Sequence, residues 1–195
     1  ENEIVATKTA KDIANLDELP FPDYEGFGYG EAMKYMEKTG YWIGDRPAFI
    51  LSSRSCPYNC TFCFHTAGKK YRRATLDYVF NQINWMIKNY NCWNFNFSDE
   101  LFGLDEQYVL DFCDRIDSIN LNWSVSMRVD CITEQMAKRM AETGCKWILY
   151  GIESADDDIL KSMNKKITQS QINEALRITR KNNIGVIGYL IFGDH

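Results

Sequence analysis

The sequence lacks long hydrophobic runs, and no stretch reaches the roughly 18 consecutive apolar residues that a membrane-spanning helix needs. The first residues, ENEIVATKTAKD, are polar and contain no apolar core of a secretory signal peptide. Basic residues are also scarce, with 22 Lys and Arg against 27 Asp and Glu and a net charge of −5. This acidic balance argues against a nucleic-acid-binding surface. We therefore expect a cytoplasmic protein that contacts neither membrane nor nucleic acid.

Cysteine is present, but not in a pattern typical of secreted proteins. Seven cysteines in a chain without a signal indicate a reducing compartment, where thiols serve as core residues, ligands or nucleophiles. Four of them are scattered through periodic segments and are expected to be small buried hydrophobes: Cys92, Cys113, Cys131 and Cys145. The other three lie within SRSCPYNCTFC at the spacing C-x-x-x-C-x-x-C: Cys56, Cys60 and Cys63. No fourth cysteine is close to these three.

The chain divides into a segment of little periodicity and a segment of alternating elements. Residues 1–45 include LPFPDYEGFGYGE, which holds two prolines and three glycines and predicts a linker or a loosely docked arm. From Ala48 onward strands are predicted at 48–52, 93–98, 121–128, 147–151 and 184–192, and helices at 75–90, 105–119, 133–144 and 168–181. Strands separated by helices predict right-handed βαβ units and a parallel sheet.

Two of the predicted strands alternate between apolar and polar residues. Parallel strands are normally buried on both faces and apolar throughout. Here 93–98 reads WNFNFS and 121–128 reads LNWSVSMR, so one face of the sheet is polar. That face could simply lie in water. We favour a curved or barrel-like sheet around a polar lumen, because the polar rows continue into charged groups at the carboxyl ends of the strands, where α/β folds place their sites.

The three clustered cysteines admit several ligands. Disulfides leave one thiol over, and a structural zinc site needs four ligands, for which His65 is the only nearby candidate. Three ordinary buried thiols are improbable at this density in a loop. A 4Fe–4S cluster normally takes four thiolates, so three would leave one iron open to a ligand that is not protein. Aromatic side chains within the loop could screen such a cluster from water: Tyr58, Phe62 and Phe64.

This loop, with an aromatic residue before its last cysteine and a strand before its first, resembles the signature of the radical S-adenosylmethionine (radical SAM) superfamily. The resemblance covers Ala48 to Gly193. It implies a 4Fe–4S cluster held by Cys56, Cys60 and Cys63, with Phe62 beside the cofactors. It also implies that S-adenosylmethionine binds the open iron and is reductively cleaved to a 5′-deoxyadenosyl radical. The family's barrel has six strands, so we expect residues 46–195 to form a partial (β/α)6 TIM-like barrel that is truncated after strand five.

The same resemblance suggests contacts to S-adenosylmethionine at four strand ends. In FNFSDELF the candidates for its amino group are Ser98, Asp99 and Glu100. In SMRVD the candidate for its carboxylate is Arg128, and Ser126 is a further cofactor-binding candidate. In YGIES the ribose partners are Glu153 and Ser154, and in GVIGYLIFG the adenine neighbours are Gly188 and Leu190. Each has a plain structural alternative: an acidic helix cap, a surface arginine or a turn.

A subfamily is suggested by LDELPFPDYEGF, residues 16–27, which resembles the connector after a cobalamin-binding domain in cobalamin-type radical SAM proteins. Cobalamin would then act through a domain that is not in this chain. We expect methyl transfer or ring formation, with electrons from a reductant protein such as flavodoxin or ferredoxin. The sequence assigns neither a substrate nor catalytic residues. The alternative is a non-catalytic iron–sulfur or zinc protein that uses the loop for electron transfer or structure.

The sequence further suggests that these 195 residues are a piece of a longer enzyme. The first 45 residues resemble a connector, and the predicted barrel lacks a sixth strand. We expect that the piece alone does not turn over substrate. We also expect it to be marginally stable, or to pair along its last strand, residues 184–192.

Overall fold

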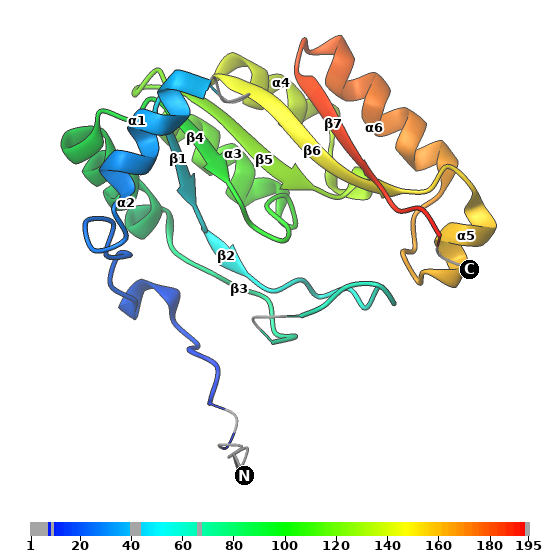
Figure 1. Cartoon of the computed structure of the whole chain (residues 1–195). Helices are drawn as coiled ribbons and strands as arrows, with labels where there is room; N and C mark the ends of the chain where they lie inside the picture. The colour runs from blue at the N-terminus through cyan, green and yellow to red at the C-terminus, as the bar shows by residue number, and fades with distance from the viewer. Residues whose placement is uncertain (1–7, 9, 40–43, 66–67, 194–195) are drawn as a thin grey trace.

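The computed structural model describes residues 8, 10–39, 44–65 and 68–193, and a five-stranded sheet forms its centre (Figure 1). The strands are β1 (Pro47–Ile50), β4 (Asn94–Phe97), β5 (Asn122–Met127), β6 (Cys145–Glu153) and β7 (Gly185–Leu190). They are adjacent in the order β1-β4-β5-β6-β7, and every neighbouring pair is parallel. This arrangement confirms the predicted α/β fold with a parallel sheet of five strands.

Helices connect the strands, apart from those in the first 40 residues, which precede β1. They are α1 (Tyr29–Thr39), α2 (Leu76–Tyr90), α3 (Glu106–Ile116), α4 (Glu134–Glu142), α5 (Asp157–Ser162) and α6 (Gln169–Lys181), with short 3-10 turns η1 (Leu16–Glu18) and η2 (Val129–Cys131). Side-chain caps fix several starts, and α6 has the full capping box of Thr168 and Gln171. Within the described ranges, no helix combines the length and apolarity needed to cross a membrane.

The core lies between one face of the sheet and the helices α2, α3, α4 and α6, which Figure 1 shows packed along it. Phe112 of α3 is its aromatic centre, with its ring 5.0 Å from Phe97 of β4 and 5.1 Å from Trp123 of β5. Phe80 of α2 packs 5.5 Å from the same ring. Alternate strand residues therefore bury their side chains against the helices, as the period of two requires.

On β4 and β5 the opposite face of the sheet is polar, as predicted, and its side chains bond to one another. Asn96 Nδ2 donates to Ser124 Oγ at 2.8 Å across β4 and β5, and both residues are buried. One step toward the amino ends, Asn122 Nδ2 donates to Asn94 Oδ1 at 3.0 Å. The bond between Asn96 and Ser124 satisfies polar groups that would otherwise be costly to bury, whereas the bond between Asn122 and Asn94 is exposed.

The described part of residues 1–45 is docked closely against the core, in contrast to the loose arm that its composition suggests. Leu16, Tyr24 and Met33 are each at most 6% exposed and belong to the hydrophobic core. The Asp17 carboxylate accepts bonds from the backbone N and Oγ1 of Thr75, at 2.9 and 2.7 Å, at the start of α2. Residues 1–7, 9 and 40–43 of this segment lie outside the described residues.

A two-stranded antiparallel ladder of β2 (Ser53–Arg54) and β3 (Arg72–Arg73) joins the residues on either side of the cysteine loop, which we define as residues 55–65. Because the ladder directly follows β1, the cysteine loop starts near the carboxyl end of that strand and leads away from it. In Figure 1 the loop extends from β2 beneath the carboxyl ends of the sheet toward α5.

Candidate functional site

A cavity of about 270 Å³ brings the cysteine loop together with the carboxyl ends of the strands. The predicted site residues that line it are Cys56, Cys60, Phe62, Cys63, Asp99, Glu100, Ser126, Arg128 and Glu153. They come from segments that are distant in sequence and meet because parallel strands end at one edge of the sheet. The structure thus places most of the predicted site around one space, at the end of the sheet where α/β folds bind ligands.

Arg128, at the end of β5, is nearly fully buried and already has partners within the protein. Its Nε and Nη2 donate to the two carboxylate oxygens of Asp130 at 2.9 and 2.8 Å, and Nη2 also donates to the Lys165 carbonyl at 2.9 Å. Its guanidinium carbon lies 3.6 Å from the centre of the Tyr58 ring in the cysteine loop. Asp130 therefore occupies the Nε–Nη2 edge, one of the two edges through which an arginine can bind a ligand carboxylate.

A buried ion pair forms another part of the cavity wall. Lys165 Nζ is 2.8 Å from Glu153 Oε1, and both side chains are less than 10% exposed. Glu153 ends β6 with φ at +63°, a left-handed conformation that is uncommon for a residue other than glycine. The Lys165 ammonium also lies 5.6 Å from the Phe62 ring centre. Neither charged group is well hydrated in this buried position. Each therefore depends on its hydrogen bond to the other to compensate for the lost water.

Lys165 is a cavity residue that the sequence analysis missed. It lies in a Lys-Lys pair between α5 and α6, and the sequence there carries no local signal for burial. Its burial depends on contacts with β6 and the cysteine loop, which have no local signature. Tyr189 of β7 also lines the cavity and was missed.

Asp99, directly after β4, is buried and holds the chain that leads to the cysteines. One carboxylate oxygen accepts from the Ser53 backbone N at 2.8 Å, and the other accepts from Ser52 Oγ. Burial raises the pKa of Asp99 to about 6, although these hydrogen bonds favour the carboxylate. Glu100 beside it is exposed.

The thiols of the loop sit in mixed electrostatic surroundings. Burial raises the pKa of Cys56, and the nearby Arg128 guanidinium acts in the opposite direction. Burial likewise raises the pKa of Cys63, assisted by the Glu100 carboxylate, while the Lys165 ammonium lowers it. The two cations therefore reduce the cost of bringing negative charge into this part of the cavity.

Four predicted residues lie away from the cavity walls: Ser98, Ser154, Gly188 and Leu190. The Ser98 hydroxyl donates to Asn96 Oδ1 at 2.6 Å, and the Ser154 hydroxyl accepts from Asp156 N at 3.1 Å in a local turn. On β7, side chains alternate between the two faces, and Tyr189 is the residue that lines the cavity. Gly188 and Leu190 therefore present the other face of the strand.

The remaining cysteines fit the expectation of small core residues in most cases. Cys92, Cys113 and Cys145 are buried, whereas Cys131 is of intermediate exposure. None of the four lines the cavity.

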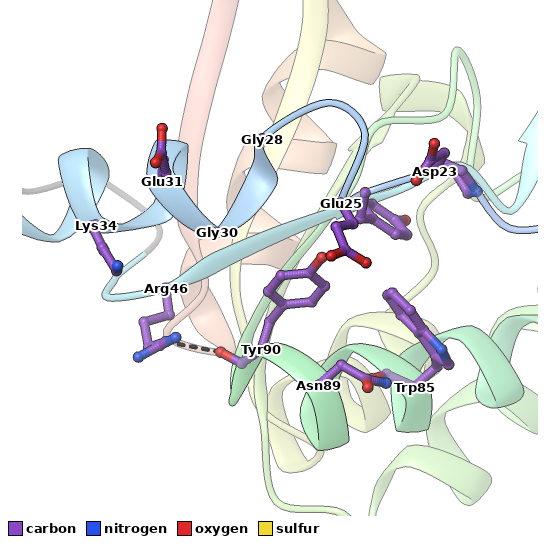
Figure 2. Close-up of a pocket in the computed structure, with 12 residues that line it drawn as sticks. Asp23, Glu25, Gly28, Gly30, Glu31, Lys34, Arg46, Trp85, Asn89 and Tyr90 are labelled. Carbon is purple, nitrogen blue, oxygen red and sulfur yellow. Dashed lines mark hydrogen bonds between the residues drawn. The ribbon is translucent and has the colours of Figure 1, made fainter.

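A larger pocket, of about 650 Å³, lies between the N-terminal segment and the end of α2 (Figure 2). The Tyr24 ring stacks on Trp85 with centres 5.3 Å apart, and Arg46 Nε donates to the Tyr90 carbonyl at 2.9 Å. Arg46 directly precedes β1, so this pocket is at the amino end of that strand. Among the described residues that line it there is no cysteine, and size alone does not make it the site of the chemistry.

Comparison with known proteins shows relatives that cover nearly the whole chain. An uncharacterized methyltransferase of Pyrococcus horikoshii is 31% identical over 93% of this chain and 39% of its own length. An anaerobic magnesium-protoporphyrin IX monomethyl ester cyclase of Cereibacter sphaeroides is 25% identical over 98% of this chain and 31% of its own. The chain thus spans well under half the length of either relative.

A solved structure shares the fold. The cobalamin-dependent S-adenosylmethionine radical enzyme OxsB, in its apo form, superposes with a TM-score of 0.76 at 21% identity, over 95% of this chain and 28% of that one. The family model of the radical SAM superfamily matches residues 50–195, which include the cysteine loop and every strand end that lines the cavity. The chain therefore belongs to the radical SAM superfamily.

Proposed function

We propose that this chain is the catalytic core of a cobalamin-dependent radical SAM methyltransferase. One observation carries the proposal: Cys56, Cys60 and Cys63 line the same cavity as the Lys165–Glu153 pair at the carboxyl ends of the strands. A loop that served only for electron transfer or structure would not require buried charged groups facing the thiols. Two of the similar proteins, a methyltransferase and a cobalamin-dependent radical enzyme, support the assignment.

The donor set fits a 4Fe–4S cluster. Within the described ranges, no group of three His, Cys, Asp or Glu side chains surrounds a single metal-ion position. A cluster does not need that arrangement, because each of its irons takes one thiolate. Three thiolates along one cavity wall leave one iron for a further ligand, as proposed for S-adenosylmethionine. When bound, the cluster supplies the electron that cleaves S-adenosylmethionine to the 5′-deoxyadenosyl radical.

The protein's own residues would hold and orient these groups. Arg128 and Lys165 place positive charge beside the thiolates. Glu100 and Ser126 are proposed to meet the methionine part of the ligand, and Glu153 its ribose. Asp99 is proposed to position the loop through Ser52 and Ser53. Arg128 can bind the ligand carboxylate bidentately only if Asp130 releases the Nε–Nη2 edge or the Lys165 carbonyl releases Nη2 on the other edge.

Other parts of the proposal extend beyond this site. We infer that the sheet curves into a partial (β/α)6 barrel with its polar face toward the lumen, and that residues 1–45 connect to a cobalamin-binding domain. A reductant protein such as flavodoxin or ferredoxin would supply electrons in the cytoplasm. Ring formation is the second candidate reaction, favoured by the cyclase among the relatives.

The proposed function is tested by anaerobic reconstitution of the full-length protein with iron and sulfide. We expect one 4Fe–4S cluster per chain, whose electron paramagnetic resonance spectrum changes when S-adenosylmethionine is added. Cys60→Ala should lose the cluster, whereas Cys113→Ala, a buried thiol away from the cavity, should retain it. Iron that survives Cys60→Ala, or a spectrum that ignores S-adenosylmethionine, would contradict the proposal.

A further inference from the structure

The cysteine loop has little structure of its own. It contains no helix or strand, and a backbone bond within it runs from Cys63 N to the Cys60 carbonyl, at 3.2 Å. Ser55, directly before the first cysteine, has φ at +70°, in the left-handed region of backbone conformation. Such a loop takes its shape from the surfaces against which it rests, so the elements that contact it decide where the three thiols point.

The segment between α5 and α6 makes two of these contacts. Asn164 Nδ2 donates to the Asn59 carbonyl at 2.7 Å, and the Met163 carbonyl accepts from Thr61 N at 2.9 Å. The two bonds bracket Cys60, the central cysteine of the loop. They join segments about one hundred residues apart in sequence, so they are tertiary contacts and not part of a local turn.

This segment is itself firmly held. Met163 is fully buried, and the Lys165 backbone N donates to the Leu160 carbonyl at 3.0 Å. Arg128 Nη2 binds the Lys165 carbonyl, and the Lys165 ammonium binds Glu153. Asn164 has φ at +51°, a left-handed conformation that asparagine tolerates better than most residues. The segment can therefore act as a fixed support.

We propose that Met163–Lys165 is a clamp for the cysteine loop and that Asn164 is a positioning residue within it. Together with Arg128 on Tyr58, the clamp contacts loop positions between the cysteines and leaves the thiols for the cavity. The clamp also includes Lys165, which pairs with Glu153. One segment therefore positions both the cysteine loop and the ion pair of the cavity. The role of Asn164 toward a cluster rests on the proposed function, but its grip on the loop does not.

The test is Asn164→Asp in the full-length protein. Aspartate keeps the size and tolerates the left-handed backbone, but it places an oxygen instead of an N–H donor against the Asn59 carbonyl. In the metal-free protein we expect amide hydrogen exchange in residues 59–63 to become about 3- to 10-fold faster, with exchange in α6 unchanged. In protein reconstituted with iron and sulfide, we expect the variant still to bind iron. Its electron paramagnetic resonance spectrum, and the response of that spectrum to S-adenosylmethionine, should differ from those of the unmodified protein.

Asn120→Asp is the matched control, because Asn120 has φ at +53° and lies at the amino end of β5, remote from the cysteines. It should alter neither loop exchange nor the spectrum. Unchanged loop exchange in Asn164→Asp, or equal effects of the two substitutions, would overturn the clamp. Failure of the unmodified protein to bind a cluster would instead overturn the proposed function, while the exchange comparison would still decide the clamp.

Discussion

Asp99 is a buried carboxyl group whose two oxygens hold the chain just after β1. Its pKa of about 6 lies above the value near 3.9 of an unfolded chain, so the folded protein binds this proton more tightly. The stability that it contributes is therefore fully present below about pH 4 and is lost as pH rises through about 6. For one proton, the free energy of unfolding changes by at most about 1.4 kcal/mol per pH unit.

We predict that Asp99→Asn removes this component of the pH dependence. Urea unfolding of the metal-free protein between pH 4.5 and 7 should show stability that falls less with pH in the variant than in the unmodified protein. Asp105→Asn is the control: the hydrogen bond from Arg73 lowers the pKa of Asp105, so its titration lies below this range. Asp105→Asn should shift the free energy of unfolding but keep its dependence on pH. An unchanged pH dependence in Asp99→Asn would contradict the prediction.

Single residues also mark where prediction from the sequence stopped. The three cysteines were found because thiols at this spacing have few other uses. Lys165 was missed because burial of a lysine is decided by distant partners, here Glu153 and the cysteine loop. The bond from Arg128 to Asp130 was also missed, although the two are only two residues apart, because side-chain direction after a strand end depends on the surrounding fold.

At the scale of elements, helix ends with strong local signals were predicted closely. The helix predicted at 75–90 is observed at Leu76–Tyr90, because Thr75 caps its start and Asn91 ends it in a left-handed conformation. Helix α1 was missed because glycines surround its start, and α5 because six residues give too short a periodic pattern. The polar face of the sheet was predicted from alternation alone, since a period of two fixes which side chains share a face.

Close packing at the sheet edge gives a prediction for β7. A Cβ added to Gly185 would lie 2.3 Å from Trp147 Cε3 on β6, so the indole ring must move. A Cβ added to Gly188 on the same strand would meet only the end of the flexible Ile152 side chain, at 2.8 Å. Gly185→Ala should therefore destabilise the protein by about 1–3 kcal/mol in urea unfolding.

Gly188→Ala serves as the control on the same strand and should change stability by less than about 1 kcal/mol, because Ile152 can adopt another rotamer. Equal losses in the two variants would mean that the indole of Trp147 does not fix the approach of β6 and β7.

At the scale of the whole molecule, helices cover one face of the sheet, and β1 and β7 are its outer strands among the described residues. Among the described strands, β7 pairs only with β6. Large apolar side chains on and after this strand are exposed: Tyr189 at 51%, Leu190 at 54% and Phe192 at 88%. An exposed strand edge with apolar side chains is a template for pairing with another chain.

We therefore predict that residues 1–195, expressed alone, associate along β7. Sedimentation velocity should show an average mass that rises toward at least a dimer with protein concentration. The double substitution Leu190→Lys and Phe192→Lys should keep the chain monomeric, because charged side chains oppose edge pairing. Phe27→Lys with Tyr35→Lys is the control, since these residues are 85% and 69% exposed but belong to the N-terminal segment. A monomer at every concentration, or loss of association in the control, would show that the edge of β7 does not drive assembly.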